Sequence, residues 1–175
     1  MQLGLVHIYC GDGKGKTTAA LGLALRALGH GYKVLLVQFL KSQDTGELKV
    51  FDSIPNTKVL RSREKFGFTF QMTEEQKKRC IIEHNKLLEK AREICSLDQI
   101  DLIILDEIIS AYNYNLVNRA ETIKFLKEKP KNLEVVLTGR DPAAELLQFA
   151  DYISEIKKIK HPFDRGITAR TGVEK

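Results

Sequence analysis

The feature that constrains this chain most is an alternation of short apolar runs with helical patterns. The runs are rich in branched residues and lie at residues 5–9, 34–39, 59–60 (weak), 102–105, 133–137 and 152–159. Between the first two runs, residues 17–28 are rich in Ala and Leu, and Gly29 and Gly31 follow as they commonly do at helix ends. The alternation predicts an α/β fold, in which helices cover a mostly parallel sheet.

The clearest helix is predicted over residues 74–95. Thr73 and Gln76 form a capping box at its start, which satisfies two backbone donors. Apolar residues recur there every three or four positions and predict one stripe buried against the sheet. The stripe comprises Cys80, Ile81, His84, Leu87, Leu88, Ala91, Ile94 and Cys95.

Two shorter helices are predicted further along the chain. One covers residues 117–129 and stops at Pro130. The other begins with Asp141 as its N-cap and Pro142 at its first helical position.

Composition limits the class of protein. With 175 residues, 43% hydrophobic and 29% charged, residues 1–175 are expected to form a single domain. A net charge of +5 favours an anionic ligand, either a phosphate compound or nucleic acid. Three cysteines without metal-ligand spacing argue against disulfides and zinc, and no run is long enough to span a membrane, so we expect a cytoplasmic protein. Residues 41–70 and 161–175 are the least regular, and we expect them to be loops around a site.

Directly after the first apolar run lies Cys10-Gly11-Asp12-Gly13-Lys14-Gly15-Lys16-Thr17-Thr18, here called the glycine loop. Backbone N–H groups converge on a phosphate only where no side chain intrudes, which explains the three glycines. The helix that starts near Lys16 points its positive end at the same anion. Lys16 adds a charge for the terminal phosphates, and the hydroxyl of Thr17 is suited to ligate Mg²⁺.

Cys10 departs from the usual phosphate-loop pattern, which has Gly at this position. The preceding strand, the following helix and the Gly-Lys-Thr sequence still favour phosphate binding over an ordinary strand-to-helix turn. For Lys14, contact with phosphate and a solvated position both remain open.

A second group of candidate residues follows the apolar run 102–105. Asp106 and Glu107 stand at the carboxyl end of this predicted strand, the edge at which open α/β sheets bind ligands. A Mg²⁺ ion shared with Thr17 would supply the positive charge that buried carboxylates need. The alternative is that one of them caps the next turn.

Arg140 ends Thr138-Gly139-Arg140 after another apolar run, so a parallel strand would bring its guanidinium to the same edge. A surface ion pair is the alternative. His7 is predicted to be a core histidine with its polar atoms satisfied, and His30 to lie at a helix end.

With these residues in view, the chain resembles the P-loop family of ATP:corrinoid adenosyltransferases from about residue 6 to residue 173. The implied fold is a three-layer P-loop NTPase-like (RecA-like) α/β fold. The glycine loop is common to many NTPases, and the departure at Cys10 fits this family. The more selective markers are Val37-Gln38-Phe39-Leu40-Lys41, Gly67-Phe68-Thr69-Phe70 and Lys160-His161-Pro162-Phe163-Asp164-Arg165-Gly166. Further markers are Gly46-Glu47, Leu105-Asp106-Glu107 and Leu137-Thr138-Gly139-Arg140.

The resemblance implies transfer of the 5′-deoxyadenosyl group of ATP to cobalt(I) of a reduced corrinoid, with release of triphosphate. ATP would be bound in the reverse of the usual P-loop orientation, so that C5′ of the ribose faces the nucleophile. The implied catalytic residues are Lys16, Thr17 and Glu107, and Mg²⁺ (or Mn²⁺) would be bound by Thr17, Glu107 and Asp106. The implied ATP-binding residues are Gly11, Asp12, Gly13, Lys14, Gly15, Lys16, Thr17, Thr18 and Arg140.

Phe68 and Phe70 match the aromatic pair that displaces the lower axial ligand of the corrinoid in this family. Relatives often have Trp where Phe70 stands, so a smaller ring would close the lower face here. Longer relatives also have an N-terminal helical extension that helps cover the corrinoid. Members are commonly homodimers, and an electron-donating reductase is implied as a partner.

Two other functions compete with this interpretation. A P-loop ATPase or kinase would cleave the γ-phosphate and leave ADP. A nucleotide-gated module that binds nucleic acid is suggested by the net charge and by Lys157-Lys158-Ile159-Lys160, although so short a segment is more typical of a solvated strand edge. We therefore expect no nucleic-acid partner and no membrane.

Overall fold

The computed structural model describes residues 3–41, 45–62, 64, 66–67 and 69–174, without the side chain of residue 70. Within them lies a parallel six-stranded sheet in the order β3-β2-β4-β5-β1-β6. The strands are β1 (Val6–Cys10), β2 (Val34–Gln38), β3 (Thr57–Arg61), β4 (Leu102–Asp106), β5 (Glu134–Thr138) and β6 (Tyr152–Glu155). The predicted parallel α/β fold is confirmed.

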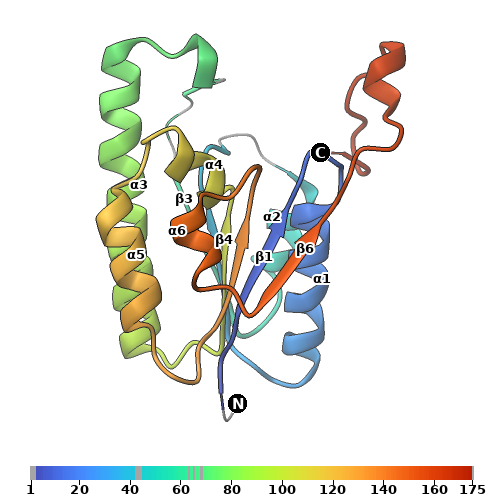
Figure 1. Ribbon diagram of the computed structural model, residues 1–175. Coiled ribbons are helices and arrows are strands. Elements are labelled where there is room, and N and C mark those ends of the chain that lie inside the picture. Colours follow the sequence, from blue (N-terminus) through green and yellow to red (C-terminus); the bar gives the residue numbers. More distant parts are fainter. Residues whose placement is uncertain (1–2, 42–44, 63, 65, 68, 175) are drawn as a thin grey trace.

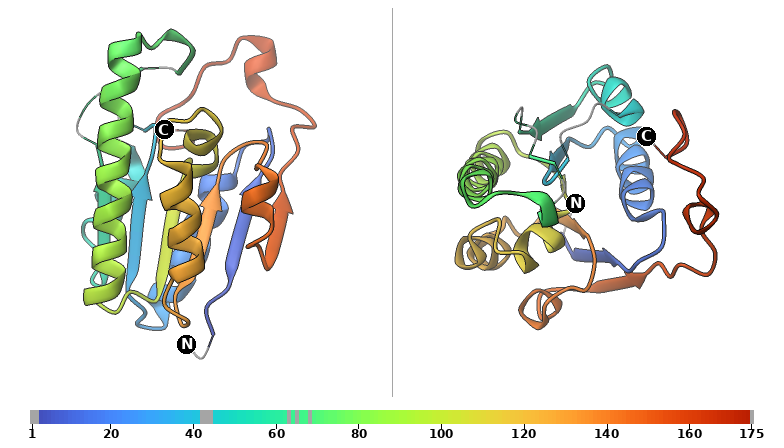
Figure 2. Two further views of the ribbon diagram at one scale, coloured as in Figure 1. Left: turned by 60° about the vertical axis from the view of Figure 1, so that its left-hand side comes forward. Right: turned by 90° about the horizontal axis from the view of Figure 1, so that it is seen from above.

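Helices cover both faces of the sheet (Figure 1). The helices are α1 (Lys16–Gly29), α2 (Gly46–Phe51), α3 (Glu74–Leu97), α4 (Ile108–Asn113), α5 (Arg119–Glu128) and α6 (Ala144–Leu147), with the 3₁₀ turns η1 (Thr69–Gln71) and η2 (Pro162–Arg165). Figure 2 shows α1 and α2 on one side of the sheet and α3 and α5 on the other. The result is the predicted three-layer arrangement.

Each face of the sheet has its own apolar core. The central strands β2 and β4 are buried at every position, because helices cover both of their faces. On the α1 side, Ala20 and Ala24 of the helix contact sheet residues such as Leu36 and Ile104. On the other side, α3, α5 and α6 cover a larger core that includes Ile8, Val37, Leu105 and Leu137. This packing fixes the strand ends from which the site is built.

The predicted features of α3 are confirmed. The capping box is present, with the backbone N–H of Gln76 donating to Thr73 and that of Thr73 to Gln76. The stripe faces the core: Cys80, His84, Leu87, Leu88, Ala91 and Cys95 are buried, while Ile81 and Ile94 are partly buried. His30 is the C-cap of α1, as predicted for a helix-end residue.

Two predicted helix starts are wrong. The helix expected from residue 117 begins at Arg119, because the side chain of Asn118 caps it by accepting from the N–H of Glu121 at 3.1 Å. Asp141 is not an N-cap: its φ is +48°, and the helix starts at Ala144 with Ala143 as N-cap. The carbonyl oxygen of Asp141 accepts a hydrogen bond from Asn113 Nδ2 at 2.8 Å, which holds the chain in this turn.

Other boundaries also differ from the prediction. The last strand ends at Glu155 instead of continuing to residue 159. The segment 41–70, expected to be mostly irregular, contains α2, β3 and η1 in its described part. There the hydroxyl of Thr57 donates to the carbonyl oxygens of Phe51 and Ile54 and so connects the end of α2 to β3.

His84 lies in the core, as predicted, and both ring nitrogens have partners. Nδ1 donates to the carbonyl oxygen of Leu116 at 2.9 Å, and Nε2 accepts from the backbone N–H of Leu40 at 3.2 Å. A proton on Nε2 would face another N–H, and burial lowers the pKa of this imidazole to about 4. Neutral His84 therefore stabilises the turn after β2.

We predict that His84 makes the free energy of unfolding depend on pH. His84 takes up a proton near pH 6.5 in the unfolded chain and only near pH 4 in the folded chain. Its contribution to the free energy of unfolding is therefore fully present above pH 6.5 and decreases as the pH falls toward 4. Urea unfolding of the wild type and of His84→Gln should show their difference in stability shrinking by about 2 kcal/mol between pH 7 and pH 5. A difference independent of pH would contradict this role.

Candidate functional site

A cavity of 810 Å³ lies at the carboxyl edge of the sheet and is here called the edge cavity. It is lined by the glycine loop, by the segments that follow β2, β4 and β5, and by residues of the C-terminal segment. Its lining contains most of the residues predicted for ATP and metal. The lining residues are Asp12, Gly13, Lys14, Gly15, Lys16, Thr17, Thr18, Leu21, Leu40, Lys41, Thr45, Gly46, Glu47, Gly67, Glu107, Arg140, His161, Ala169, Gly172, Val173 and Glu174.

The glycines of the glycine loop are required for different reasons. Gly15, the N-cap of α1, has a φ of +123°, a conformation that residues with a Cβ rarely adopt. A Cβ on Gly11 or Gly13 would lie only 2.4 Å or 2.7 Å from the carbonyl oxygen of Ile156, in the segment after β6. The N–H of Gly13 donates to that same oxygen at 2.8 Å. The chain after β6 therefore supports the outer side of the loop.

Lys16 begins α1 and is 8% exposed. Its ammonium group donates to the carbonyl oxygen of Gly13 at 2.8 Å, so the side chain folds back over the glycine loop. Burial lowers the pKa of this ammonium group, and the nearby carboxylate of Glu107 acts in the opposite direction. A polyphosphate in the edge cavity would give Lys16 a stronger partner than a backbone carbonyl.

Asp106 is fully buried at the end of β4 and is the centre of the Asp106 cluster, which comprises Asp106, Thr17, Thr138 and Lys41. Its Oδ1 accepts hydrogen bonds from the hydroxyls of Thr17 at 2.9 Å and Thr138 at 2.7 Å. Its Oδ2 accepts from the ammonium group of Lys41 at 2.6 Å. The cluster thus joins the ends of β2, β4 and β5 to the start of α1.

Glu107 differs from Asp106 in that it lines the edge cavity. Its φ is +61°, and its N–H donates to the hydroxyl of Thr138 at 2.9 Å, which holds the residue in this left-handed conformation. One carboxylate oxygen accepts from the hydroxyl of Ser110 at 2.8 Å. Although Glu107 is the N-cap residue of α4, its side chain makes no capping hydrogen bond. The carboxylate therefore remains available to a ligand.

Arg140 reaches the edge cavity because of a close approach between β5 and α4. A Cβ on Gly139 would lie 2.6 Å from Cβ of Ile109, and φ of Gly139 is +150°. The carbonyl oxygen of Arg140 accepts from Asn113 Nδ2 at 3.1 Å. The backbone that carries the Arg140 side chain is thus fixed at Gly139 and at the carbonyl group of Arg140.

Asp12, Lys14 and Thr18 also line the edge cavity. The carboxylate of Asp12 accepts from the N–H of Lys158 at 2.9 Å, and this hydrogen bond lowers the pKa of the carboxyl group. Asp12 therefore helps hold the segment after β6 against the glycine loop. Asp12 was predicted from the loop sequence, but its bond to this distant segment was not.

The C-terminal segment contributes His161 and residues 169 and 172–174 to the lining. Arg170 pairs with Glu174, with Nη2 to Oε1 at 2.8 Å and Nε to Oε2 at 3.1 Å. This pairing lowers the pKa of the Glu174 carboxyl group to about 2. The segment predicted to be a loop near a site is therefore placed beside the edge cavity.

The two predicted corrinoid residues cannot be placed in the same way. Phe68 lies outside the described residues, and of Phe70 only the backbone is described, within η1. Their neighbour Gly67 lines the edge cavity with a φ of +73°.

Gln38, Lys41 and Thr138 are among the polar residues of this site that had no predicted role. Each belongs to a marker segment, and Gln38 and Thr138 end β2 and β5. Polar residues at the carboxyl ends of otherwise apolar strands are a signal that could have indicated them. Gln38 is 1% exposed, and its Nε2 lies 3.5 Å from Oδ2 of Asp106.

His7, predicted to be a satisfied core histidine, does have a partner, because its Nε2 lies 2.5 Å from Oε1 of Glu134. Its ring stacks on Tyr152 of the edge strand, with 4.6 Å between the ring centres, and it is partly buried. It thus belongs to the amino-terminal half of the sheet and has no contact with the edge cavity.

The few donor side chains at the edge cavity fit a cation whose remaining ligands are phosphate oxygens and water. Among the described residues, no group of three or more His, Cys, Asp or Glu side chains is arranged to hold a metal. Thr17 and Glu107 both line the edge cavity, and the carboxylate of Asp106 accepts a hydrogen bond from the hydroxyl of Thr17. Mg²⁺ typically combines one or two carboxylates with phosphate oxygens and water.

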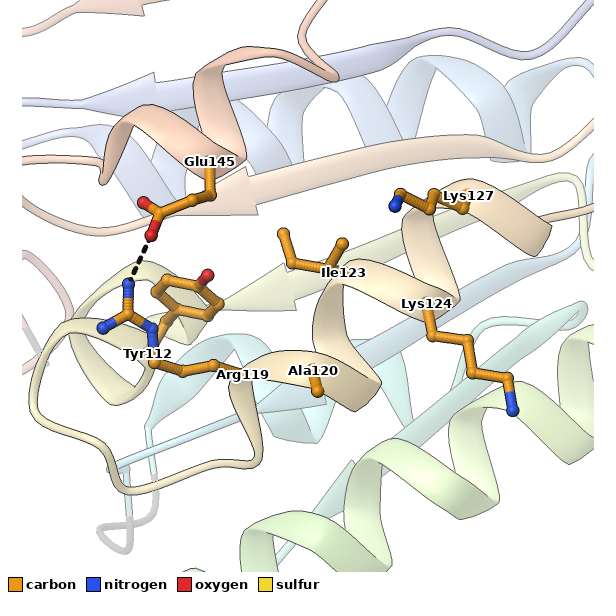
Figure 3. Close-up of a pocket in the computed structure, with 7 residues that line it drawn as sticks. All are labelled: Tyr112, Arg119, Ala120, Ile123, Lys124, Lys127 and Glu145. Atoms are coloured by element: carbon orange, nitrogen blue, oxygen red, sulfur yellow. Dashed lines mark hydrogen bonds and ion pairs between the residues drawn. The ribbon is translucent and has the colours of Figure 1, made fainter.

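A second cavity, of 510 Å³, lies between α5 and α6 (Figure 3). The guanidinium group of Arg119 stacks 4.4 Å above the ring of Tyr112 and bonds to Glu145 at 3.0 Å. Ala120, Ile123, Lys124 and Lys127 complete the lining. None of the predicted site residues contributes to this cavity.

Comparison with known families agrees with the geometry of the edge cavity. The model of the family "ATP:corrinoid adenosyltransferase BtuR/CobO/CobP" matches residues 2–174. The chain belongs to this adenosyltransferase family. The resemblance inferred from the sequence is thereby confirmed.

Curated relatives support the same membership of the adenosyltransferase family. A corrinoid adenosyltransferase of Sinorhizobium sp is 37% identical over 179 residues, which cover 99% of this chain and 81% of the relative. A corrinoid adenosyltransferase of Escherichia coli K12 is 33% identical over 177 residues, covering 99% of this chain and 86% of the relative.

Among solved structures, a KaiC-like protein from Pyrococcus horikoshii OT3 is similar with a TM-score of 0.57 and 14% identity. The match covers 90% of this chain and 74% of that protein, and it supports the P-loop fold of this adenosyltransferase family member. The predicted fold class is confirmed. None of the described helices combines the length and the apolar character that a membrane span requires.

We predict that Lys16→Ala removes most of the affinity for ATP. Truncating one partner of a buried charge pair costs about 2–5 kcal/mol, which is roughly 30-fold or more in affinity. Calorimetric titration with ATP measures the effect. Lys33→Ala, at the opposite end of the sheet, is the control and should bind ATP like the wild type. Wild-type affinity in Lys16→Ala would count against the glycine loop as the ATP site.

Proposed function

We propose that this chain transfers the 5′-deoxyadenosyl group of ATP to cobalt(I) of a corrinoid and releases triphosphate. The observation that carries the proposal is the edge cavity of a corrinoid adenosyltransferase family member, where the glycine loop, Glu107 and Arg140 converge. In this proposal, residues 1–175 work as one domain.

Binding of the triphosphate would use the backbone and cations of the glycine loop. Gly15 and Lys16 lie at the positive end of α1, and Lys14, Thr18 and Arg140 line the same cavity. Charge increases on the leaving triphosphate as the C5′–O bond breaks. Donors already fixed around that anion lower the barrier without reorganising.

The reaction places unusual demands on orientation. Cobalt(I) is itself a strong nucleophile, so no general base is required, and the protein has to align C5′ with the metal. Alignment contributes roughly 7–11 kcal/mol in well-oriented model reactions. ATP bound in reverse, as in the family, would keep the triphosphate on the glycine loop and turn C5′ toward the open side of the edge cavity.

Thr17 and Glu107 would hold Mg²⁺ (or Mn²⁺), with Asp106 behind them. The ion neutralises part of the charge on the triphosphate when it is bound. Asp106 already accepts hydrogen bonds from Thr17 and Thr138 through Oδ1. In this proposal Oδ1 of Asp106 orients Thr17 and Oδ2 serves the ion, whereas Glu107 faces the ligand.

Phe68 and Phe70 would bind the corrinoid. An apolar ring against cobalt(II) offers no lone pair, so loss of the lower axial ligand makes reduction easier. Phe70 presents a smaller surface than the Trp common in relatives. We further propose a cytoplasmic homodimer that receives electrons from a reductase.

Binding of nucleic acid is not part of the proposal. Two lysines of the basic segment after β6 are paired, Lys157 with Glu155 at 3.2 Å and Lys158 with Asp164 at 3.0 Å. These pairs reduce the positive field that phosphate backbones require.

The products of the reaction test the proposal directly. With ATP, a divalent metal ion and chemically reduced cob(I)alamin, the expected products are triphosphate and adenosylcobalamin in equal amounts. Phosphorus NMR identifies the phosphate product, and the change in the visible spectrum identifies the corrinoid. ADP and phosphate without an adenosylated corrinoid would instead establish the ATPase or kinase alternative.

We predict that Phe68→Ala affects reduction more than alkyl transfer. Adenosylation from cob(II)alamin under a weak reductant should slow about tenfold or more, while adenosylation from chemically prepared cob(I)alamin changes little. Tyr114→Ala, an exposed aromatic residue at the end of α4, is the control and should leave both rates unchanged. Equal slowing of both reactions in Phe68→Ala would show that this ring does not control the axial ligand.

A further inference from the structure

The residue that stands out in the edge cavity is Lys41, which follows β2. Leu40 has a φ of +58°, a conformation held by the hydrogen bond from its N–H to Nε2 of His84 at 3.2 Å. The N–H of Phe39 donates to the carbonyl oxygen of Asp106 at 2.9 Å. These two contacts turn the chain at the end of β2, and Lys41 reaches back to the start of α1.

The ammonium group of Lys41 bridges two residues that we propose to serve the metal. It lies 2.6 Å from Oδ2 of Asp106 and 3.0 Å from Oγ1 of Thr17. The Lys41 side chain is 27% exposed, whereas that of Asp106 is fully buried. Lys41 therefore enters the Asp106 cluster from the wall of the edge cavity, and it can leave without opening the core.

A divalent cation and this ammonium group would compete for the same oxygens. Like charges a few ångströms apart repel strongly where water is partly excluded. The ammonium group already occupies the position between the Thr17 hydroxyl and the Asp106 carboxylate. Close approach of a metal to both oxygens thus requires Lys41 to move.

Gln38 provides a second, independent observation. It is 1% exposed, and within the described part of the chain its Oε1 is a buried oxygen without a hydrogen-bond partner. Its Nε2 faces Oδ2 of Asp106 at 3.5 Å. A buried acceptor without a donor is costly. The ammonium group of Lys41 donates to Asp106 and Thr17 and leaves Oε1 of Gln38 without a donor. A water molecule bound to a hydrated Mg²⁺ ion would supply that donor.

We propose that Lys41 is a positioning residue that substitutes for the metal in the nucleotide-free chain and yields its place to the divalent cation that enters with ATP. In the free chain it neutralises Asp106 and keeps Thr17 oriented. After displacement it remains at the cavity wall, facing the triphosphate. This inference rests on the proposed metal site at Thr17, Glu107 and Asp106.

Binding of Mn²⁺ to the nucleotide-free protein, measured by electron paramagnetic resonance, tests the inference. Lys41→Met removes the competing charge, so its affinity for Mn²⁺ should rise about tenfold or more over that of the wild type. Lys58→Met is the control, because Lys58 pairs with Asp98 at the same 2.6 Å outside the site. Its affinity for Mn²⁺ should equal that of the wild type. An unchanged or weaker affinity in Lys41→Met would overturn the role of Lys41.

A double variant locates the effect. Adding Thr17→Val to Lys41→Met should abolish the gain in Mn²⁺ affinity, and a gain that persists would place the metal elsewhere and overturn the inference.

Thermal unfolding without metal gives a further readout: Lys41→Met should melt at a lower temperature than the wild type, and Mn²⁺ should recover most of the difference. If Lys41→Met does not fold, Lys41→Gln serves in its place, because its amide can still donate to Asp106 but carries no charge.

A different result would show that the proposed metal site itself is wrong. With ATP present and corrinoid absent, the wild type should bind Mn²⁺ and ATP together. If no such complex forms in the wild type or in Lys41→Met, the proposed metal site is wrong and the role of Lys41 falls with it. If the complex forms but the nucleotide-free affinities of the two are equal, the metal site stands and only the role of Lys41 is refuted.

Discussion

The buried carboxylate of Asp106 is the interaction on which the geometry of the site depends. A buried charge without partners would be strongly destabilising, so Asp106 can exist at the end of β4 only with the donors around it. Those donors come from the first turn of α1, the end of β5 and the segment after β2. One carboxylate therefore fixes the relative positions of three segments that border the edge cavity.

The glycine loop is supported on its other side by the chain after β6. Gly11 and Gly13 leave room for the backbone of Ile156, and Asp12 accepts a hydrogen bond from the N–H of Lys158. The loop is thus held between this segment and the Asp106 cluster before any ligand arrives. Such preorganisation suits a reaction in which the protein contributes mainly alignment and stabilisation of a leaving anion.

Much of the fold and the chemistry of the site could be predicted from the sequence, because they follow from local patterns. The glycine loop stands between a strand and a helix, Asp106 ends an apolar strand with Glu107 directly after it, and Arg140 follows another strand. Parallel strands bring their carboxyl ends to one edge, so the convergence of these residues followed from the strand pattern alone.

What could not be predicted depends on contacts between distant segments. The role of Lys41 requires β2 to lie beside β4 and Leu40 to adopt a positive φ, which His84 of α3 stabilises. The failure of Asp141 as an N-cap has the same origin, since Asn113 of α4 holds its carbonyl oxygen in a turn. Local propensity favoured a cap there, and the tertiary contact overrode it.

The most direct test of the account is a crystal structure of the chain with ATP and Mg²⁺. We expect the triphosphate on the glycine loop with Lys16 contacting it, the hydroxyl of Thr17 still bonded to Asp106, and C5′ of the ribose turned toward open space in the edge cavity. An ATP molecule with the opposite polarity, whose γ-phosphate faces that space while C5′ is enclosed by protein, would contradict it.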